Sequence, residues 1–198
     1  LFGESHGKCV GALVEGVPAG TPLDTETLLR DLLRRKPGRK GLSQRSEPDA
    51  CEILSGVYEG KATGWPILML TMNSDAKSRD YSFLPDHPRP GHADLVESVR
   101  SDGTADLRGG GSQSARLTFG LVAAGSQART LLDKVGWSCF AHLHSVGEVK
   151  SRPLFDLDRK TPLDPSSDSG RLNCRDAEAA KSMSHEIELV RKDRDTIG

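Results

Sequence analysis

The chain has 198 residues, with 27 Lys and Arg against 28 Asp and Glu, so its formal net charge is −1 at pH 7. This even balance argues against a polybasic nucleic-acid-binding tail and against a membrane-surface domain, since both need an excess of one sign of charge. The longest apolar run, Trp65 to Leu70, is far shorter than the roughly 20 residues that span a bilayer. We therefore expect neither a nucleic acid nor a membrane as partner.

The four cysteines are scattered along the chain, and no two of them form a Cys-x-x-Cys pair. Their spacing predicts neither a zinc knuckle nor a dense disulfide framework, so we expect reduced thiols and a cytoplasmic location. No signal or transit peptide is visible at the first residues, Leu1-Phe2-Gly3. The length suits one domain, because domains typically have ~100–200 residues.

The first part of the chain predicts strands around one helix. Small or apolar residues alternate with polar ones over Cys9–Val17, which predicts a strand that runs into a turn. Four leucines at helical spacing predict a helix that begins at Asp24 and ends at Pro37-Gly38. Two further strands are expected over Cys51–Tyr58 and Trp65–Met72.

The second part predicts a long loop and two long helices. The segment Asn73–Gly91 is polar and rich in proline, and loops of this length are often functional, so we expect ligand contacts there. A helix with a face of small apolar residues is predicted over Ser112–Val135. A strand over Trp137–Val149, a linker over Pro153–Arg171 and an amphipathic helix over Asp176–Arg194 complete the chain.

The segment Gly3-Glu4-Ser5-His6-Gly7 fits the pattern G-x-S-x-G of a nucleophile elbow, in which a turn from strand to helix exposes the serine. A strand-like segment follows it here, which argues against a serine hydrolase. His6 is nevertheless suited to act as a general acid at neutral pH. A turn with a purely structural role explains the five residues about equally well.

A run of basic residues extends from Arg34 to Lys40, and Arg45 follows it. Guanidinium groups bind phosphate or carboxylate through two parallel hydrogen bonds, which lysine cannot make. Taken alone, however, the run is better explained as a solvated helix end.

The segment Arg89-Pro90-Gly91-His92-Ala93-Asp94 combines backbone-restricting residues with chemically active ones. Proline and glycine would hold Arg89 and His92 in a defined geometry. By residue type, His87, His92 and Asp94 suit a metal ion, but no second ligand pair supports one, so no metal site is expected. The pair His142 and His144 is explained by the surface face of the predicted strand.

The segment from Gly109 to Arg116 is a glycine-rich loop that leads into a predicted helix. Free backbone N–H groups and the positive end of the helix dipole favour an anion such as phosphate there. The pattern is neither G-x-G-x-x-G nor a P-loop. A flexible connection with an ordinary N-cap has comparable weight.

Taken in order, these segments resemble the chorismate synthase family. The resemblance rests on Phe2–Gly7, Gly16–Gly20, Arg34–Gly38, Gln44–Asp49, Ile53–Gly56, Ser78–Ser82, Arg89–Asp94, Gly109–Arg116 and Val122–Gly125. It is dense up to about Leu132 and thinner beyond. The chain resembles the N-terminal portion of such an enzyme, so residues 1–198 are expected to form a single partial domain.

The resemblance implies an α+β fold of the β-α-β sandwich type, with central long helices between antiparallel sheets, and a homotetramer. It also implies a lyase of the shikimate pathway of aromatic amino acid biosynthesis. The small-molecule substrate is 5-enolpyruvylshikimate 3-phosphate, which loses phosphate by 1,4-anti elimination to give chorismate. Reduced FMN is required, and NADPH or a separate flavin reductase is left open as the source of its electrons.

The resemblance also assigns roles to individual residues. His6 would protonate or stabilise the departing phosphate, and His92 would manage the proton near N1 of the reduced flavin. The residues expected to bind substrate are Ser5, Arg35, Arg39, Arg45, Arg89 and Arg116. Those expected to line the FMN site are Ser112, Gln113 and Ser114.

Two features separate this chain from many relatives. Their glycine-rich segment continues Arg-Ser-Ser-Ala-Arg-Glu-Thr, whereas here Ser112 and Leu117 replace the arginine and the glutamate. The loop after Gly38 is one residue shorter, so Arg39 and Lys40 compete for one substrate-binding position. A non-catalytic anion-binding or assembly fragment of the same fold is the alternative function, and these residues alone are expected to be inactive.

Overall fold

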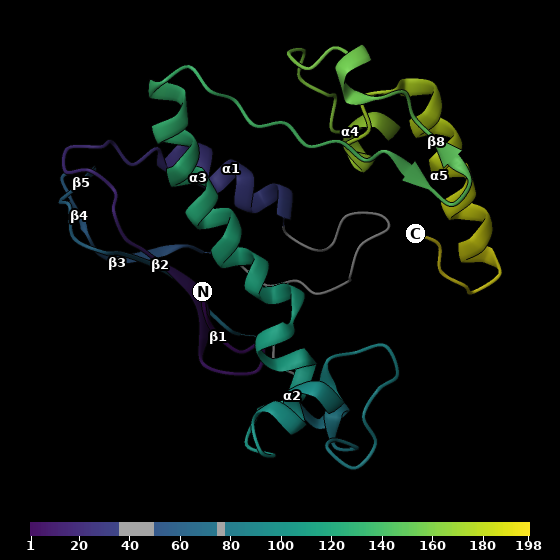
Figure 1. Cartoon of the computed structure of the whole chain (residues 1–198), viewed down its shortest axis with the longest axis horizontal. Coiled ribbons are helices and arrows are strands. Elements are labelled where there is room, and N and C mark those ends of the chain that lie inside the picture. The colour runs from purple at the N-terminus through teal and green to yellow at the C-terminus, as the bar shows by residue number, and fades with distance from the viewer. Residues whose placement is uncertain (36–49, 75–77) are drawn as a thin grey trace. The chain divides into compact units, whose positions relative to one another are not determined.

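A computed structural model describes residues 1–35, 50–74 and 78–198. The chain divides into two compact units, Leu1–Trp137 and Ser138–Gly198 (Figure 1). Each unit has its own apolar core and is described here by itself. The expected single partial domain over residues 1–198 stays a prediction.

Unit 1 is built on a four-stranded antiparallel sheet with the order β1-β2-β6-β3. Its strands are β1 (Phe2–Gly3), β2 (Cys9–Val14), β6 (Ile67–Met72) and β3 (Glu52–Ser55). The central pair aligns Cys9 with Met72 and Val14 with Ile67. Because side chains alternate between the two faces of a strand, every second residue of β2 and β6 enters the core. This alternation confirms the two predicted strands.

Two helices, α1 (Thr25–Arg35) and α3 (Thr118–Lys134), contribute to the core beneath this sheet, and Figure 1 shows α3 crossing it with α1 alongside. The buried core residues are Val10, Val17, Leu28, Leu32, Ala62, Ile67, Met69, Phe119 and Ala123. A Cβ atom added at Gly120 would lie 2.5 Å from the carbonyl oxygen of Gly11, so glycine lets α3 approach β2 closely. Between the two helices, Nη1 of Arg129 on α3 donates a hydrogen bond of 2.6 Å to Oδ2 of Asp31 on α1.

The strand predicted over residues 51–58 is interrupted at Gly56. This glycine has φ of +77°, and a Cβ atom there would lie 2.5 Å from the carbonyl oxygen of Pro66. The chain therefore turns between β3 and a small hairpin of β4 (Val57–Tyr58) and β5 (Lys61–Ala62). A single uninterrupted strand over this segment was a wrong prediction.

The long helix begins later than predicted. Gly109, Gly110 and Gly111 all have positive φ, and Ser114 is extended, so regular helix starts only at Thr118. Residues before it form two short 3-10 turns, η2 (Arg108–Gln113) and η3 (Ala115–Leu117). Upstream, the polar loop contains η1 (Ser78–Tyr81) and leads to α2 (Asp94–Arg100).

Unit 2 packs two helices against a hairpin. Its elements are β7 (Ser145–Val146), β8 (Val149–Lys150), η4 (Leu154–Asp156), α4 (Asp168–Leu172) and α5 (Ala177–Lys192). Asp176 caps α5 by accepting from the backbone N–H of Ala179, which confirms the predicted start of that helix.

The strand predicted over residues 137–149 is wrong for most of its length, because only the two-residue strand β7 and the first residue of β8 lie within it. Its polar groups bind the segment before α5 instead of a neighbouring strand. The backbone N–H of Leu143 donates to the carbonyl of Asn173, and His142 Nδ1 accepts from the backbone N–H of Arg175 at 3.1 Å. His142 Nε2 then bonds to Ser151 Oγ at 2.7 Å, so its partners come from loops.

In the parts of the chain that the structure describes, no helix combines the length and the apolar character needed to cross a membrane.

Candidate active site

The turn between β1 and β2 lies directly against the glycine-rich segment. Ser5 is buried and 1% exposed, and its hydroxyl lies 3.1 Å from the carbonyl oxygen of Arg108 and 3.0 Å from that of Gly109. Its backbone N–H donates to the carbonyl of Gly111 at 3.1 Å. A hydroxyl that donates to carbonyls has no base to activate it, so this geometry does not support a serine hydrolase.

Gly109 is the point of closest approach between the two segments. A Cβ atom added there would lie 2.4 Å from Ser5 Oγ and 2.6 Å from His6 Nε2, and its φ is +61°. Only glycine satisfies both the backbone conformation and the space available. The buried imidazole of His6 is therefore held against the backbone of this segment.

Arg116 lies beneath the same turn and is buried, with 6% exposure. Its Nε donates to Asn73 Oδ1 at 3.1 Å, and the amide nitrogen of Asn73 donates to the carbonyls of Glu4 and Gly7. The sequence did not single out Asn73 as a site residue. Its only signal was its place at the start of the polar loop predicted to contact ligand.

Tyr81 joins His6 to the Arg89 segment. Its ring stands nearly perpendicular to the His6 ring, at 86°, with 5.0 Å between centroids. The guanidinium carbon of Arg89 lies 5.3 Å from the Tyr81 centroid, a cation–π geometry. Tyr81 lies in Ser78–Ser82, one of the segments that carry the family resemblance, but it was not predicted as a site residue.

Arg89 is held by Asp94 through two hydrogen bonds of 2.8 Å. These bonds raise the pKa of Arg89 and lower the pKa of Asp94 below its usual range. The backbone N–H of His92 donates to the carbonyl of Arg89 at 3.3 Å, and its side chain is exposed. Asp94 is bound to Arg89, and among the described residues no group of three or more His, Cys, Asp or Glu side chains could hold a metal ion.

The remaining arginines predicted to bind substrate differ in placement. Arg35 ends α1, and its Nη1 donates to Thr118 Oγ1 at 3.3 Å, which brings it to the first residue of α3. Arg39 and Arg45 lie outside the described residues. Arg35 and Arg116 therefore converge on the N-terminal end of one helix.

The three residues predicted to line a cofactor site have different surroundings. Ser112 is exposed, and Gln113 is exposed but donates from Nε2 to Glu97 Oε1 at 3.1 Å. Ser114 caps η3, where its hydroxyl accepts from the backbone N–H of Arg116. The structure thus places all three beside Arg116 and the glycines, with the Ser114 hydroxyl already in use as an acceptor.

A pocket opens on one side of this segment. Its lining includes Gly110 and Ser112 together with the carboxylates of Glu4, Glu97 and Asp106. Arg100 and Arg108 lower the pKa values of Glu97 and Asp106, respectively, by hydrogen bonding. Both carboxylates are therefore ionised and paired at neutral pH.

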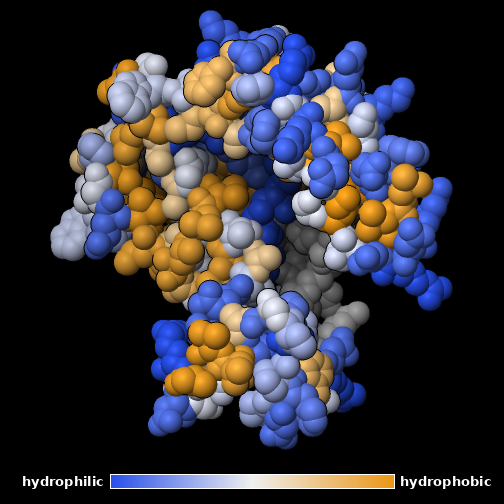
Figure 2. Space-filling view, turned by 45° about the vertical axis from the view of Figure 1, so that its right-hand side comes forward, coloured by the Kyte–Doolittle hydropathy of each residue, from blue (hydrophilic) through white to orange (hydrophobic). Residues whose placement is uncertain are grey.

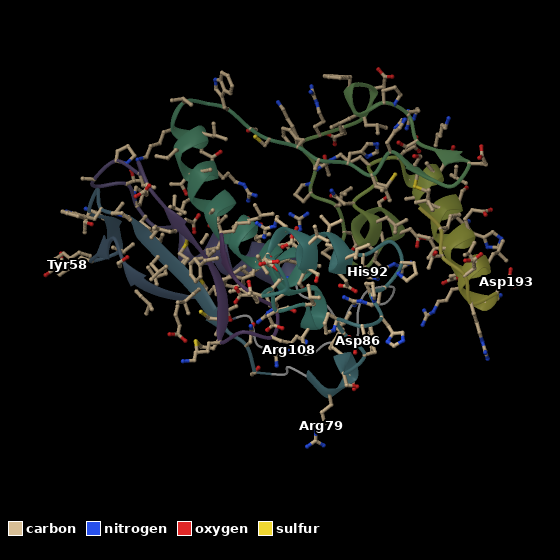
Figure 3. All side chains as sticks on the ribbon, turned by 60° about the horizontal axis from the view of Figure 1, so that its bottom comes forward. Tyr58, Arg79, Asp86, His92, Arg108 and Asp193 are labelled. Atoms are coloured by element: carbon tan, nitrogen blue, oxygen red, sulfur yellow. The ribbon has the colours of Figure 1, made fainter. Side chains whose placement is uncertain are left out.

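Figure 3 shows two of the outlying side chains of this region. His92 stands out from its loop, whereas Arg79 points away from the fold into solvent. The groups that the structure brings together are thus Ser5, His6, Tyr81, Arg89 and Arg116, around the glycine-rich segment. Two arginines and an imidazole suit a phosphate-bearing anion.

The whole chain, residues 1–198, matches the family model of chorismate synthase. Similar proteins include the chorismate synthases of Methanococcoides burtonii, 42% identical over 203 residues, and Pyrococcus abyssi, 43% identical over 199 residues. Each alignment covers 100% of this chain, but 53% and 54% of the respective relative.

A solved structure described as the crystal structure of chorismate synthase also matches, with a TM-score of 0.69 and 28% identity. The match covers 100% of this chain and 53% of the chain in that solved structure. The chain therefore spans about half the length of the relatives it matches, and the resemblance first seen in its motifs is confirmed: it belongs to the chorismate synthase family.

Proposed function

We propose that the protein to which this chain belongs is a chorismate synthase. It removes phosphate from 5-enolpyruvylshikimate 3-phosphate by 1,4-anti elimination and yields chorismate in the shikimate pathway. The observation that carries this proposal is the meeting of Ser5 and His6 with Gly109, about a hundred residues away, beside the buried Arg116.

The first task of the site is to bind a substrate with one phosphate and two carboxylates. The chain as a whole has a net charge of −1, so it must concentrate positive charge locally. Arg35 and Arg116 at the start of α3 supply that charge, and Arg89, already paired with Asp94, belongs to the same proposed set. Arg39 and Arg45, with Ser5, complete the proposed substrate-binding set.

The second task is to manage charge and protons during the elimination, which breaks one C–O bond and removes one proton. Negative charge grows on the departing phosphate, and preorganised donors lower the barrier most when they face that charge. His6 stabilises or protonates the leaving phosphate, and His92 would manage the proton near N1 of reduced FMN once that cofactor is bound. The Arg89–Asp94 pair fixes the loop from which His92 projects.

The third task is to hold reduced FMN, which when bound supplies the difficult electronic step. The donors at the glycine-rich segment fit such a group: Ser112 and Gln113 are exposed, and a Cβ atom at Gly110 would meet nothing closer than 3.7 Å. Ser114 lies beside them, and its hydroxyl, which accepts a hydrogen bond as it caps η3, also carries one O–H donor. Since the reaction has no net redox change, NADPH or a flavin reductase serves only to keep FMN reduced.

The surface supports a larger assembly. Leu29 and Leu33 on α1 and Leu121 on α3 are more than half exposed, on the faces turned away from the core. Figure 2 shows hydrophobic residues gathered in patches on the face in view. We assign these faces to a β-α-β sandwich in which the helices lie between two sheets, within a cytoplasmic homotetramer.

The test is an anaerobic assay of the full-length gene product with the substrate and photoreduced FMN, following chorismate absorbance and phosphate release together. Equimolar products that vanish when FMN is oxidised are the expected result. The 198-residue chain, assayed beside it, is expected to be inactive. No product from the full-length protein would overturn the proposal and favour a non-catalytic anion-binding or assembly role.

A further inference from the structure

We propose that Asn73 is a positioning residue that couples the turn carrying His6 to Arg116. The inference rests on the proposed function, because it assigns Asn73 a role in the chemistry of those two residues. It starts from the place of Asn73 in the fold. Asn73 directly follows β6, and its backbone N–H donates to the carbonyl of Lys8 at 3.0 Å, so the sheet fixes where its side chain begins.

The side-chain amide of Asn73 uses both of its donors on one turn. Nδ2 donates to the carbonyl of Glu4 at 3.0 Å and to that of Gly7 at 2.9 Å. These two carbonyls flank Ser5 and His6. The turn lies outside the paired residues of β1 and β2, so Asn73 fastens both of its ends to the sheet.

The acceptor of the same amide faces Arg116. Nε of Arg116 donates to Oδ1 at 3.1 Å, and this contact orients a guanidinium that is almost fully buried. One planar group therefore sets the distance between the proposed acid and a proposed phosphate-binding arginine. Small displacements of such groups reduce turnover strongly, because reacting groups must be aligned before reaction.

The three contacts account for the residue type. An amide offers two donors and one acceptor, whereas aspartate offers acceptors only and serine a single hydroxyl on a shorter stem. Asn73→Asp would keep an acceptor for Arg116 and turn an oxygen toward two carbonyls. Asn73→Ala would lose all three contacts. The two variants thus separate the hold on the turn from the hold on Arg116.

The experiment uses the full-length protein with reduced FMN and 5-enolpyruvylshikimate 3-phosphate. For Asn73→Asp we expect kcat to fall about tenfold or more with KM within about threefold of the unaltered protein, because Arg116 keeps its partner. For Asn73→Ala we expect a similar fall in kcat and a rise in KM of about tenfold. Asn173→Asp is the matched control: that amide donates to the carbonyl of Ala141 in unit 2, and its loss is expected to leave both constants unchanged.

A second readout is independent of turnover. Hydrogen exchange at the amides of residues 5–8 is expected to accelerate in both Asn73 variants, while exchange in the core of α3 stays unchanged. If the unaltered protein makes no chorismate but this acceleration occurs, the proposed function fails and the structural coupling stands. Unchanged kcat in both variants of an active protein, or unchanged exchange, overturns the coupling. If neither variant folds, Asn73→Gln, which keeps the amide group but moves it by one methylene, decides by the same measurements.

Discussion

Gly109 and Gly110 share a left-handed backbone and differ in what surrounds them. Their φ values are +61° and +87°. A Cβ atom at Gly109 would collide with Ser5 and His6, whereas one at Gly110 would have only Ser114 near it, at 3.7 Å. Alanine at Gly110 should therefore introduce backbone strain alone, whereas alanine at Gly109 should introduce the same strain and also displace His6.

We predict that Gly109→Ala lowers kcat of the full-length enzyme by about a hundredfold or more, since His6 must move. Gly110→Ala bears only the left-handed penalty of roughly 1–2 kcal/mol and should lower kcat less than tenfold. Steady-state kinetics and thermal unfolding of both variants measure the two effects. Equal losses of kcat would show that strain alone matters and that His6 does not depend on Gly109.

At this scale the sequence predicted which chemistry is present but not all of the contacts that arrange it. Ser5, His6 and the glycine-rich segment were recognisable because each forms a short local pattern. Asn73 and Tyr81 act through contacts with residues far away in the chain, and a single asparagine after a strand has no distinctive pattern. Arg39 and Arg45 stay predictions outside the described residues.

Helix α3 joins the core to the candidate site and has one buried and one exposed face. Substitutions on these two faces should change the free energy of unfolding by different amounts. Phe119 is fully buried against the sheet, whereas Leu121 is 57% exposed. Phe119→Ala should lower the free energy of unfolding by roughly 3–5 kcal/mol through the cavity it leaves. Leu121→Ala should change it by less than about 0.5 kcal/mol in the 198-residue chain. Urea denaturation followed by circular dichroism measures both, and a large loss for Leu121→Ala would mean that its face is covered.

The cap of α5 predicts a dependence on pH. Backbone and side-chain hydrogen bonds from Arg152 lower the pKa of Asp176 to about 2. A carboxyl group with a depressed pKa stabilises the fold above its unfolded pKa of 3.8, and this stability is lost as the pH falls from about 4 to about 2. Asp176→Ala should lower the free energy of unfolding by roughly 0.5–2 kcal/mol at pH 7.

The check is urea denaturation at pH 7 and at pH 2.5, with Asp193→Ala, an exposed residue after the same helix, as the control. The difference between Asp176→Ala and the unaltered chain should shrink at the lower pH. A difference that stays constant over this range would contradict the assigned role of the ionised carboxylate.

Elements were predictable where local signals agree with the tertiary structure. The leucine spacing of α1 and the cap of α5 correspond to buried faces and a real hydrogen bond. Three glycines and the extended Ser114 delay the start of α3, and loop contacts of His142 replace a predicted strand. In both cases the conformation depends on local backbone geometry or on contacts with distant residues, and the spacing of apolar residues in the sequence carries no information about either.

At the scale of the whole chain, the segment that connects the two units allows the most direct test of whether they are separate compact bodies. Residues 133–141 are all exposed, and Trp137 and Phe140 lie among them. Tyr58 is also exposed, but it belongs to β4 and pairs with Lys61 of β5 in a hairpin. Proteases need an extended, accessible segment, and few hydrogen bonds hold residues 138–140.

We therefore predict that, among aromatic sites, chymotrypsin cleaves the 198-residue chain first after Trp137 or Phe140. The products would be one fragment of about the length of unit 1 and another of about the length of unit 2, both identified by mass spectrometry. Replacing both aromatics by alanine should slow this first cut, because the preferred side chains are gone while the backbone stays exposed. A first cut at Tyr58 or Phe155 instead would mean that the segment after α3 is better protected than an exposed aromatic residue inside either unit, and that the two units do not behave as separate compact bodies.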